Sequence, residues 1–146
     1  MNKKWIDRFY QHAIDVAKWS KDKNTKVGCV IVNEDKNILT CGYNGFPRGA
    51  NDDDFAERYE KPLKYMWTEH AERNAIYNAT RNGVSLNNSI AFVTYFPCSD
   101  CARALIQVGV KRVYSPMPDF KHKKWGDSWQ TSKDMFTECG VELFWV

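Results

Sequence analysis

Blocks of apolar and polar residues along the chain predict a helix followed by a strand pair. In residues 5–19 apolar side chains recur every three or four positions among lysines and aspartates, which is typical of an amphipathic helix. A polar loop then leads to the continuous apolar run 27–32, which indicates a strand buried on both faces. Turn-forming residues at 33–37 separate it from a second strand at 38–43, so we expect a hairpin.

Beyond the hairpin, helical and strand-like segments alternate. The expected helices span 69–81, 97–108 and 131–139, and the expected strands span 90–96, 110–115 and 141–146. Thr68 is the expected N-cap of the first of these helices, Asn82-Gly83 its left-handed end, and Pro97 the start of the second. The element order α-β-β-α-β-α-β-α-β predicts an α/β fold in which one five-stranded sheet lies between helical layers.

Two connections are long for a compact domain. Residues 44–67 and 116–129 show no clear period and contain glycines, prolines and charged runs. Connections of this length without structure of their own are uncommon, and those that exist are often functional. We therefore expect both to contribute to a site.

Composition narrows the possible classes of protein. A chain of 146 residues with 43% hydrophobic and 27% charged residues fits a single globular domain spanning residues 1–146. No apolar run approaches the roughly 18 residues of a membrane span, and the N-terminus lacks a signal-peptide pattern, so we expect a cytoplasmic protein that contacts no membrane. The net charge of +3 suits a phosphorylated small molecule and is too weak to predict long nucleic acid as a partner. The odd number of cysteines, five, favours reduced thiols over disulfides.

The most specific chemical signal consists of two short motifs, His70-Ala71-Glu72 and Pro97-Cys98-Ser99-Asp100-Cys101. One imidazole and two thiolates can hold a zinc ion and leave its fourth position free for water. Both motifs lie at predicted helix starts, where the helix dipole helps to keep Cys98 and Cys101 ionised. Glu72 is placed to move the proton of a water at the metal and to pass it to a ring nitrogen. This H-x-E…P-C-x-x-C pattern is the signature of zinc-dependent nucleobase deaminases, so hydrolytic deamination is the predicted reaction class.

Two alternatives accompany this interpretation. The same chemistry could act on another base, such as a free nucleoside, guanine, or adenosine in tRNA. A non-catalytic, zinc-stabilised binding module is the alternative from another class, and it requires a fourth protein ligand. No other His or Cys pair with metal spacing is present, and a structural site has no use for Glu72.

Four segments extend these motifs into a resemblance to the deoxycytidylate (dCMP) deaminase family. The zinc motifs continue as HAERNAI from His70 and as PCSDCA from Pro97, followed by IQVGV from Ile106. The other matching segments are SKD with VG near residues 20–28 and GYNGFP with a following DD near residues 42–53. The resemblance covers about residues 15–114 and implies a three-layer α/β/α fold of the cytidine deaminase type, with a five-stranded mixed sheet.

The resemblance also implies an activity and a set of roles. The activity is conversion of dCMP to dUMP and ammonia, which supplies thymidylate synthesis. His70, Cys98 and Cys101 would bind one catalytic Zn²⁺, and Glu72 would be the proton shuttle. The implied substrate-binding residues are Asn44 for the sugar, the Ala71 backbone for the ring, and Gly45, Ser20, Lys21, Lys23 and Lys26 toward the 5′-phosphate. It further implies a homohexamer and allosteric regulation by dCTP and dTTP, with Mg²⁺ accompanying a regulatory nucleotide.

The resemblance weakens after residue 114, where a basic run, Lys121-His122-Lys123-Lys124, stands in the second long connection. The sequence leaves three interpretations of this run open: a phosphate site, a surface for an acidic partner, or a solvated face.

Overall fold

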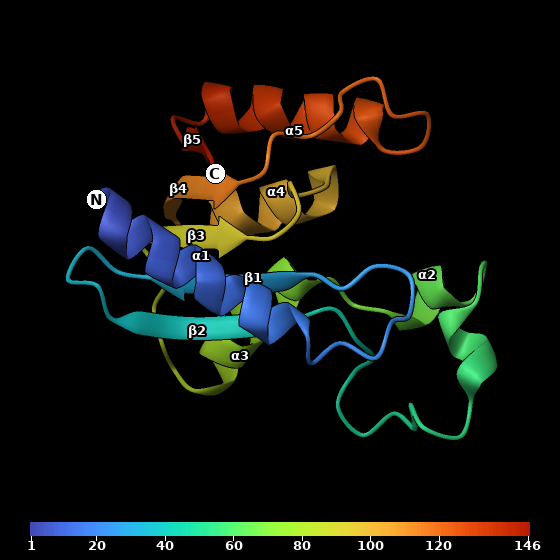
Figure 1. Cartoon of the computed structure of the whole chain (residues 1–146). Helices are drawn as coiled ribbons and strands as arrows, with labels where there is room; N and C mark the ends of the chain where they lie inside the picture. The colour runs from blue at the N-terminus through green and yellow to red at the C-terminus, as the bar shows by residue number, and fades with distance from the viewer.

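The sheet that the sequence predicts is present in the computed structural model, which describes residues 1–146 (Figure 1). The expected hairpin forms from β1 (Gly28–Val32) and β2 (Ile38–Tyr43), which pair antiparallel. The order is β2-β1-β3-β4-β5, completed by β3 (Ser89–Val93), β4 (Val110–Ser115) and β5 (Glu142–Trp145). β1 and β3 are antiparallel, whereas β3, β4 and β5 run parallel. The predicted five-stranded mixed sheet is therefore confirmed.

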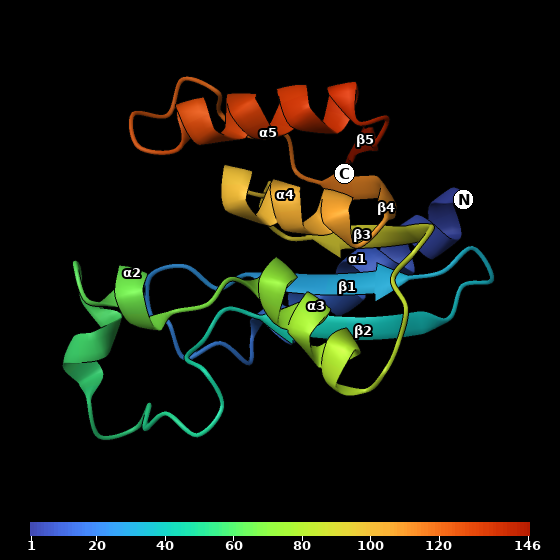
Figure 2. The ribbon, with the colours of Figure 1, turned by 180° about the vertical axis from the view of Figure 1, so that it is seen from behind.

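Helices cover the sheet on both sides. α1 (Lys3–Ala17) lies on one face, and α3 (Ala71–Arg81) and α4 (Ser99–Gln107) lie on the other, as the opposite views in Figures 1 and 2 show. α5 (Gly126–Glu138) packs beside α4, and its Trp129 and Phe136 belong to the same core cluster as α3 and α4. Along β1, Val30 faces the α1 side and Ile31 the α3 side, and every residue of the strand is buried. This two-sided burial explains the continuous apolar run. No helix is both long and apolar enough to cross a membrane.

The start of α3 differs from the prediction. Thr68 is the C-cap residue of the preceding short helix, and His70 occupies the N-cap position of α3. The Thr68 hydroxyl is buried without a hydrogen-bond partner. Thr68 is a residue type that often caps helices, but it does not cap α3. The backbone bridge between Gly45 and Glu69 delays the start of that helix until Ala71.

The two long connections carry more regular structure than their sequences indicate. Residues 44–67 contain the 3₁₀ helix η1 (Ala56–Tyr59) and the one-turn helix α2 (Lys64–Trp67), neither of which is long enough to show a period. α5 begins at Gly126 and not at residue 131, so the second connection is shorter than predicted. Gly126 permits this early start because any Cβ there would lie 2.4 Å from the Phe120 carbonyl oxygen. Both connections lie at the end of the sheet where α3 and α4 begin, as Figure 2 shows.

Candidate active site

The two sequence motifs come together at the N-termini of neighbouring helices. His70 is the N-cap residue of α3, and Cys98 is the N-cap residue of α4, with Cys101 in the first turn. The chain enters α3 through a backbone bridge in which Gly45 and Glu69 exchange hydrogen bonds of 3.1 and 2.8 Å. Helix N-termini present unpaired N–H groups and a positive dipole end, which stabilise thiolates and other anions.

Side chains outside the motifs hold the two helix starts together. Arg73 in the first turn of α3 forms an ion pair of 2.6 Å with Glu69 and reaches Asp100 in α4 at 3.8 Å. On the other side of α4, the Ser128 hydroxyl of α5 accepts a hydrogen bond of 2.9 Å from the backbone N–H of Ser99. These contacts fix the distance between the imidazole and the thiols.

The geometry of the three side chains suits a zinc ion. His70 Nδ1 lies 3.5 Å from Cys98 Sγ and 3.4 Å from Cys101 Sγ, and the three atoms lie within 4.8 Å of one another. Tetrahedral zinc with ordinary Zn–N and Zn–S bonds places nitrogen and sulfur ligands about 3.5 Å apart. One nitrogen and two sulfur donors at this spacing therefore fit zinc, and the set leaves one coordination position without a protein ligand.

Hydrogen bonding within the cluster favours a negative charge on sulfur. The hydrogen bond from the Cys101 thiol lowers the pKa of Cys98 to about 4, with further help from the His70 ring and against the effect of burial. The same hydrogen bond and burial raise the pKa of Cys101. The contact with Cys98 raises the pKa of His70. A sulfur ionised at neutral pH beside an imidazole nitrogen is the kind of donor set that zinc takes.

Glu72 lies beside this cluster in the first turn of α3. Its side chain is almost fully buried, at 4% exposure, and burial raises the pKa of its carboxyl against the opposing influence of His70. Ala71, which precedes it, is fully buried and also lines the cavity described next. A buried carboxyl within two residues of the imidazole can accept and return a proton without competition from bulk water.

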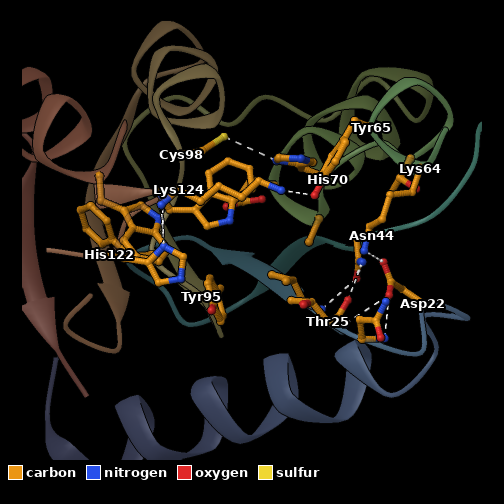
Figure 3. Close-up of a pocket in the computed structure, with 18 of the residues that line it drawn as sticks. Asp22, Thr25, Asn44, Lys64, Tyr65, His70, Tyr95, Cys98, His122 and Lys124 are labelled. Atoms are coloured by element: carbon orange, nitrogen blue, oxygen red, sulfur yellow. Dashed lines mark hydrogen bonds and ion pairs between the residues drawn. The ribbon is translucent and has the colours of Figure 1, made fainter. Parts of the chain in front are cut away.

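A cavity of about 360 Å³ opens onto the cluster (Figure 3). Its buried part includes Ala71, Glu72 and Cys98, whereas Lys61 and Lys124 are exposed at its mouth. Further lining residues come from the loop before β1, from both long connections, from the β3–α4 connection and from α5: Asp22, Lys61, Lys64, Tyr65, Tyr95, Phe96, His122, Lys124, Trp125 and Trp129. The length of the two connections, and the basic run at 121–124 in the second of them, were the sequence signals for this part of the lining.

Asn44 lines the cavity and is held by its neighbours. Its Oδ1 accepts a hydrogen bond of 2.8 Å from the Val27 N–H, and its Nδ2 donates one of 2.9 Å to the Thr25 carbonyl. The Ser20 hydroxyl donates to the Asn44 carbonyl at 2.8 Å, so Ser20 contacts Asn44 and does not itself line the cavity. One N–H and one lone pair of the Asn44 amide remain available for a ligand.

The three lysines of the 20–26 loop lie outside the cavity. Lys21 forms ion pairs of 2.8 and 2.6 Å with Asp52 and Asp53, and Lys23 and Lys26 are exposed and absent from the lining. Gly45 is also absent from the lining, because its backbone pairs with Glu69.

Asp22 is the charged group of this loop that does face the cavity. It is buried and accepts hydrogen bonds from the N–H groups of Asn24 and Thr25 at 2.8 and 3.2 Å. Its second oxygen forms an ion pair of 2.8 Å with Lys64 of α2. This ion pair links α2 to the loop before β1, and its two charges neutralise each other.

Comparison with known proteins identifies the same region. The model of the cytidine and deoxycytidylate deaminase zinc-binding region matches residues 3–117. A protein of Aliivibrio fischeri described as an uncharacterized deaminase in the luxG 3′ region is 43% identical and aligns over 100% of this chain and 96% of its own length. Human deoxycytidylate deaminase is 39% identical, with 94% of this chain and 76% of that protein covered.

Among solved structures, a dCMP deaminase from cyanophage S-TIM5 in complex with dCMP and dUMP superimposes with a TM-score of 0.81. It is 27% identical, and the match covers 100% of this chain and 99% of that one. The family match spans both zinc motifs, and the structural neighbour superimposes over the whole chain. The chain therefore belongs to the family of cytidine and deoxycytidylate deaminases.

Proposed function

We propose that this protein catalyses the hydrolytic deamination of dCMP to dUMP and ammonia. The observation that carries the proposal is the buried Glu72 carboxyl beside the His70, Cys98 and Cys101 cluster within one cavity. Relatives named deoxycytidylate deaminase, and the structural neighbour that binds dCMP and dUMP, support the choice of substrate.

The metal in this proposal is a single zinc ion held by His70, Cys98 and Cys101. Zinc in such a site supplies a hydroxide nucleophile at neutral pH, because it lowers the pKa of a coordinated water to about 7. The N-S-S donor set and the nitrogen–sulfur distances of 3.4 and 3.5 Å support this assignment.

The protein's own groups then move protons and orient the base. Glu72 takes the proton released when water adds to C4 and delivers it to N3 of the pyrimidine. The Glu72 carboxylate then takes the proton of the hydroxyl now on C4 and passes it to the amino group, so that the C4–N bond breaks, ammonia leaves and the C4 carbonyl of dUMP forms. The N-terminal backbone of α3 at Ala71 contacts the ring, and the free N–H and lone pair of Asn44 bind the sugar hydroxyl.

The substitution Glu72→Gln tests the mechanism. The amide is close in shape to the carboxyl but cannot accept the proton, so ammonia release from dCMP should fall by about 10²- to 10⁴-fold. Bound zinc and thermal stability should remain near the values of the unmodified protein. The control Glu138→Gln, at the exposed end of α5, should keep full activity. Near-normal turnover in Glu72→Gln would rule out the mechanism.

Assembly and regulation are carried over from the family as further proposals. We infer a homohexamer, and we infer that dCTP and dTTP regulate it, with Mg²⁺ accompanying the regulatory nucleotide. Size-exclusion chromatography with light scattering should then give about six times the chain mass of 17.0 kDa. A species of 17.0 kDa alone would rule out the assembly.

A further inference from the structure

The mouth of the cavity carries two positive charges that no carboxylate compensates. Lys61 and Lys124 line it, and neither forms an ion pair with an acidic side chain. The carboxyls in the lining are those of Asp22 and Glu72, and Asp22 is already paired with Lys64 at 2.8 Å. The mouth therefore attracts anions, whereas the interior holds the reacting groups.

Lys124 extends across the cavity from the second long connection to α2 (Figure 3). Its ammonium donates a hydrogen bond to the Tyr65 phenol oxygen and lies 3.9 Å from the centre of that ring. The hydrogen bond from Lys124 lowers the pKa of Tyr65, and the nearby Lys61 lowers it further, although partial desolvation opposes them. The Lys124 ammonium is thus held at a neutral oxygen and has further N–H donors available, and Lys61 lines the same cavity.

His122 adds a donor of fixed orientation. Its Nδ1 accepts hydrogen bonds from the backbone N–H groups of Lys124 and Trp125 at 3.2 and 3.1 Å. An Nδ1 that accepts carries no proton, so the proton of the neutral ring is on Nε2. The ring packs against Trp129 with centroids 5.5 Å apart, which limits its rotation. His122 also lines the cavity.

We propose that Lys61, Lys124 and the Nε2–H of His122 bind the phosphate of the substrate and make this site selective for nucleotides over nucleosides. A phosphate monoester carries about −1.5 to −2 charges at pH 7, which two ammonium groups and a neutral donor match. The lining changes from the buried Glu72 in the interior to exposed lysines at the mouth, which places a base inside and a phosphate at the mouth. The inference rests on the proposed function and names the residues that select its substrate.

The basic run at 121–124 contains a matched control residue for Lys124. Lys123 is adjacent to Lys124 and equally exposed, but it does not line the cavity. Lys123→Gln and Lys124→Gln therefore remove the same charge from neighbouring positions. Lys61→Gln removes the second ammonium from a different segment.

The kinetic test compares dCMP with deoxycytidine. Lys124→Gln and Lys61→Gln should each raise KM for dCMP about tenfold or more, with little change in kcat, because a hydrogen bond to a charged group is lost in both ground and transition states. The kcat/KM for deoxycytidine should stay unchanged, and Lys123→Gln should leave both substrates unaffected. Equal losses for dCMP and deoxycytidine, or the same KM increase in Lys123→Gln, would overturn the inference.

A binding measurement separates this inference from the proposed function. Inorganic phosphate titrated into the protein and followed by ³¹P NMR should bind the unmodified chain and bind Lys124→Gln more weakly. If the protein releases no ammonia from dCMP but phosphate binding still depends on Lys124, the proposed function fails and the anion site stands. If dCMP is deaminated and neither variant changes its KM or phosphate binding, the anion site fails and the proposed function stands.

Discussion

Gly42 lies in β2 where the strand packs against α3, and its replacement by alanine should displace the helix that carries Glu72. A Cβ at Gly42 would lie 2.3 Å from the backbone nitrogen of Ala75 and 2.5 Å from the carbonyl oxygen of Ala71. Both atoms belong to the helix backbone, so no side-chain rotation can relieve the overlap. Ordinary contact begins at 3.4 Å, so α3 has to move away from β2 by about 1 Å.

This displacement has two measurable consequences. Forced overpacking of a well-filled interior costs about 1–3 kcal/mol, which urea denaturation should detect as a lower midpoint. A misplacement of about 1 Å at reacting groups can cost about 10²-fold in rate. We therefore expect kcat for ammonia release from dCMP to fall by about two orders of magnitude in Gly42→Ala while the protein still folds.

Gly28→Ala provides the matched control. Its Cβ would lie 2.1 Å from the carbonyl oxygen of Ala13 and 2.7 Å from the nitrogen of Ala17, so the overlap is at least as severe. These atoms belong to α1, on the opposite face of the sheet, which contributes no residue to the cavity. Gly28→Ala should lose similar stability but much less kcat. Wild-type kcat in Gly42→Ala, or an equal kcat loss in both variants, would refute the reasoning.

Three further predictions concern charge, metal and thiols. Asp22→Asn should lower the free energy of unfolding by about 3 kcal/mol, since it leaves the Lys64 ammonium unpaired at a nearly buried position. Burial alone would raise the pKa of Asp22, but the hydrogen bonds from Lys64 and two backbone N–H groups lower it. The stabilisation is therefore complete above the unfolded carboxyl's pKa of about 3.9 and is lost as the pH falls through the lowered folded value, so the stability difference between Asp22→Asn and the unmodified protein should shrink over this range; a difference that stays constant at low pH would contradict this. Exhaustive chelation should lower Tm and abolish ammonia release, with recovery on Zn²⁺ but not Mg²⁺, and full activity in protein shown to be metal-free would contradict this. In metal-loaded protein, a thiol reagent should modify Cys139 rapidly and the other cysteines slowly; a rapid phase that persists in Cys139→Ser would show that another thiol is accessible.

The parts of the protein that the sequence predicts well are those determined by local patterns. Two-sided burial gives β1 its continuous apolar run, and the antiparallel hairpin follows from turn residues between two strands. The reacting groups also follow local rules, because His70 and Cys98 are N-cap residues and Cys101 lies in the first turn of α4. The prediction of Thr68 as an N-cap was wrong because a tertiary contact, the bridge between Gly45 and Glu69, sets the start of α3.

The role of the lysines at the cavity mouth could not be predicted in the same way. The sequence contains two lysine-rich loops of similar composition, and only long-range contacts distinguish them. Lys21 meets Asp52 and Asp53, acidic residues 31 and 32 positions away, and its charge is neutralised outside the cavity. Lys124 meets Tyr65 across 59 positions, and its charge is left facing the cavity. The assignment of Lys21, Lys23 and Lys26 to the phosphate stays a prediction, and the mouth lysines are its alternative.

This difference between the two loops has a consequence for substrate selection. The zinc motifs fix where a base can react. They lie at the starts of α3 and α4, whose positions are set by packing against the sheet. Nucleotide selectivity, which we place at Lys61, His122 and Lys124, depends on a contact between the one-turn helix α2 and the connection that precedes α5. Such segments tolerate sequence change better than the core does. Substitutions in residues 116–125 should therefore alter which substrates are accepted while leaving the deamination chemistry at Glu72 intact.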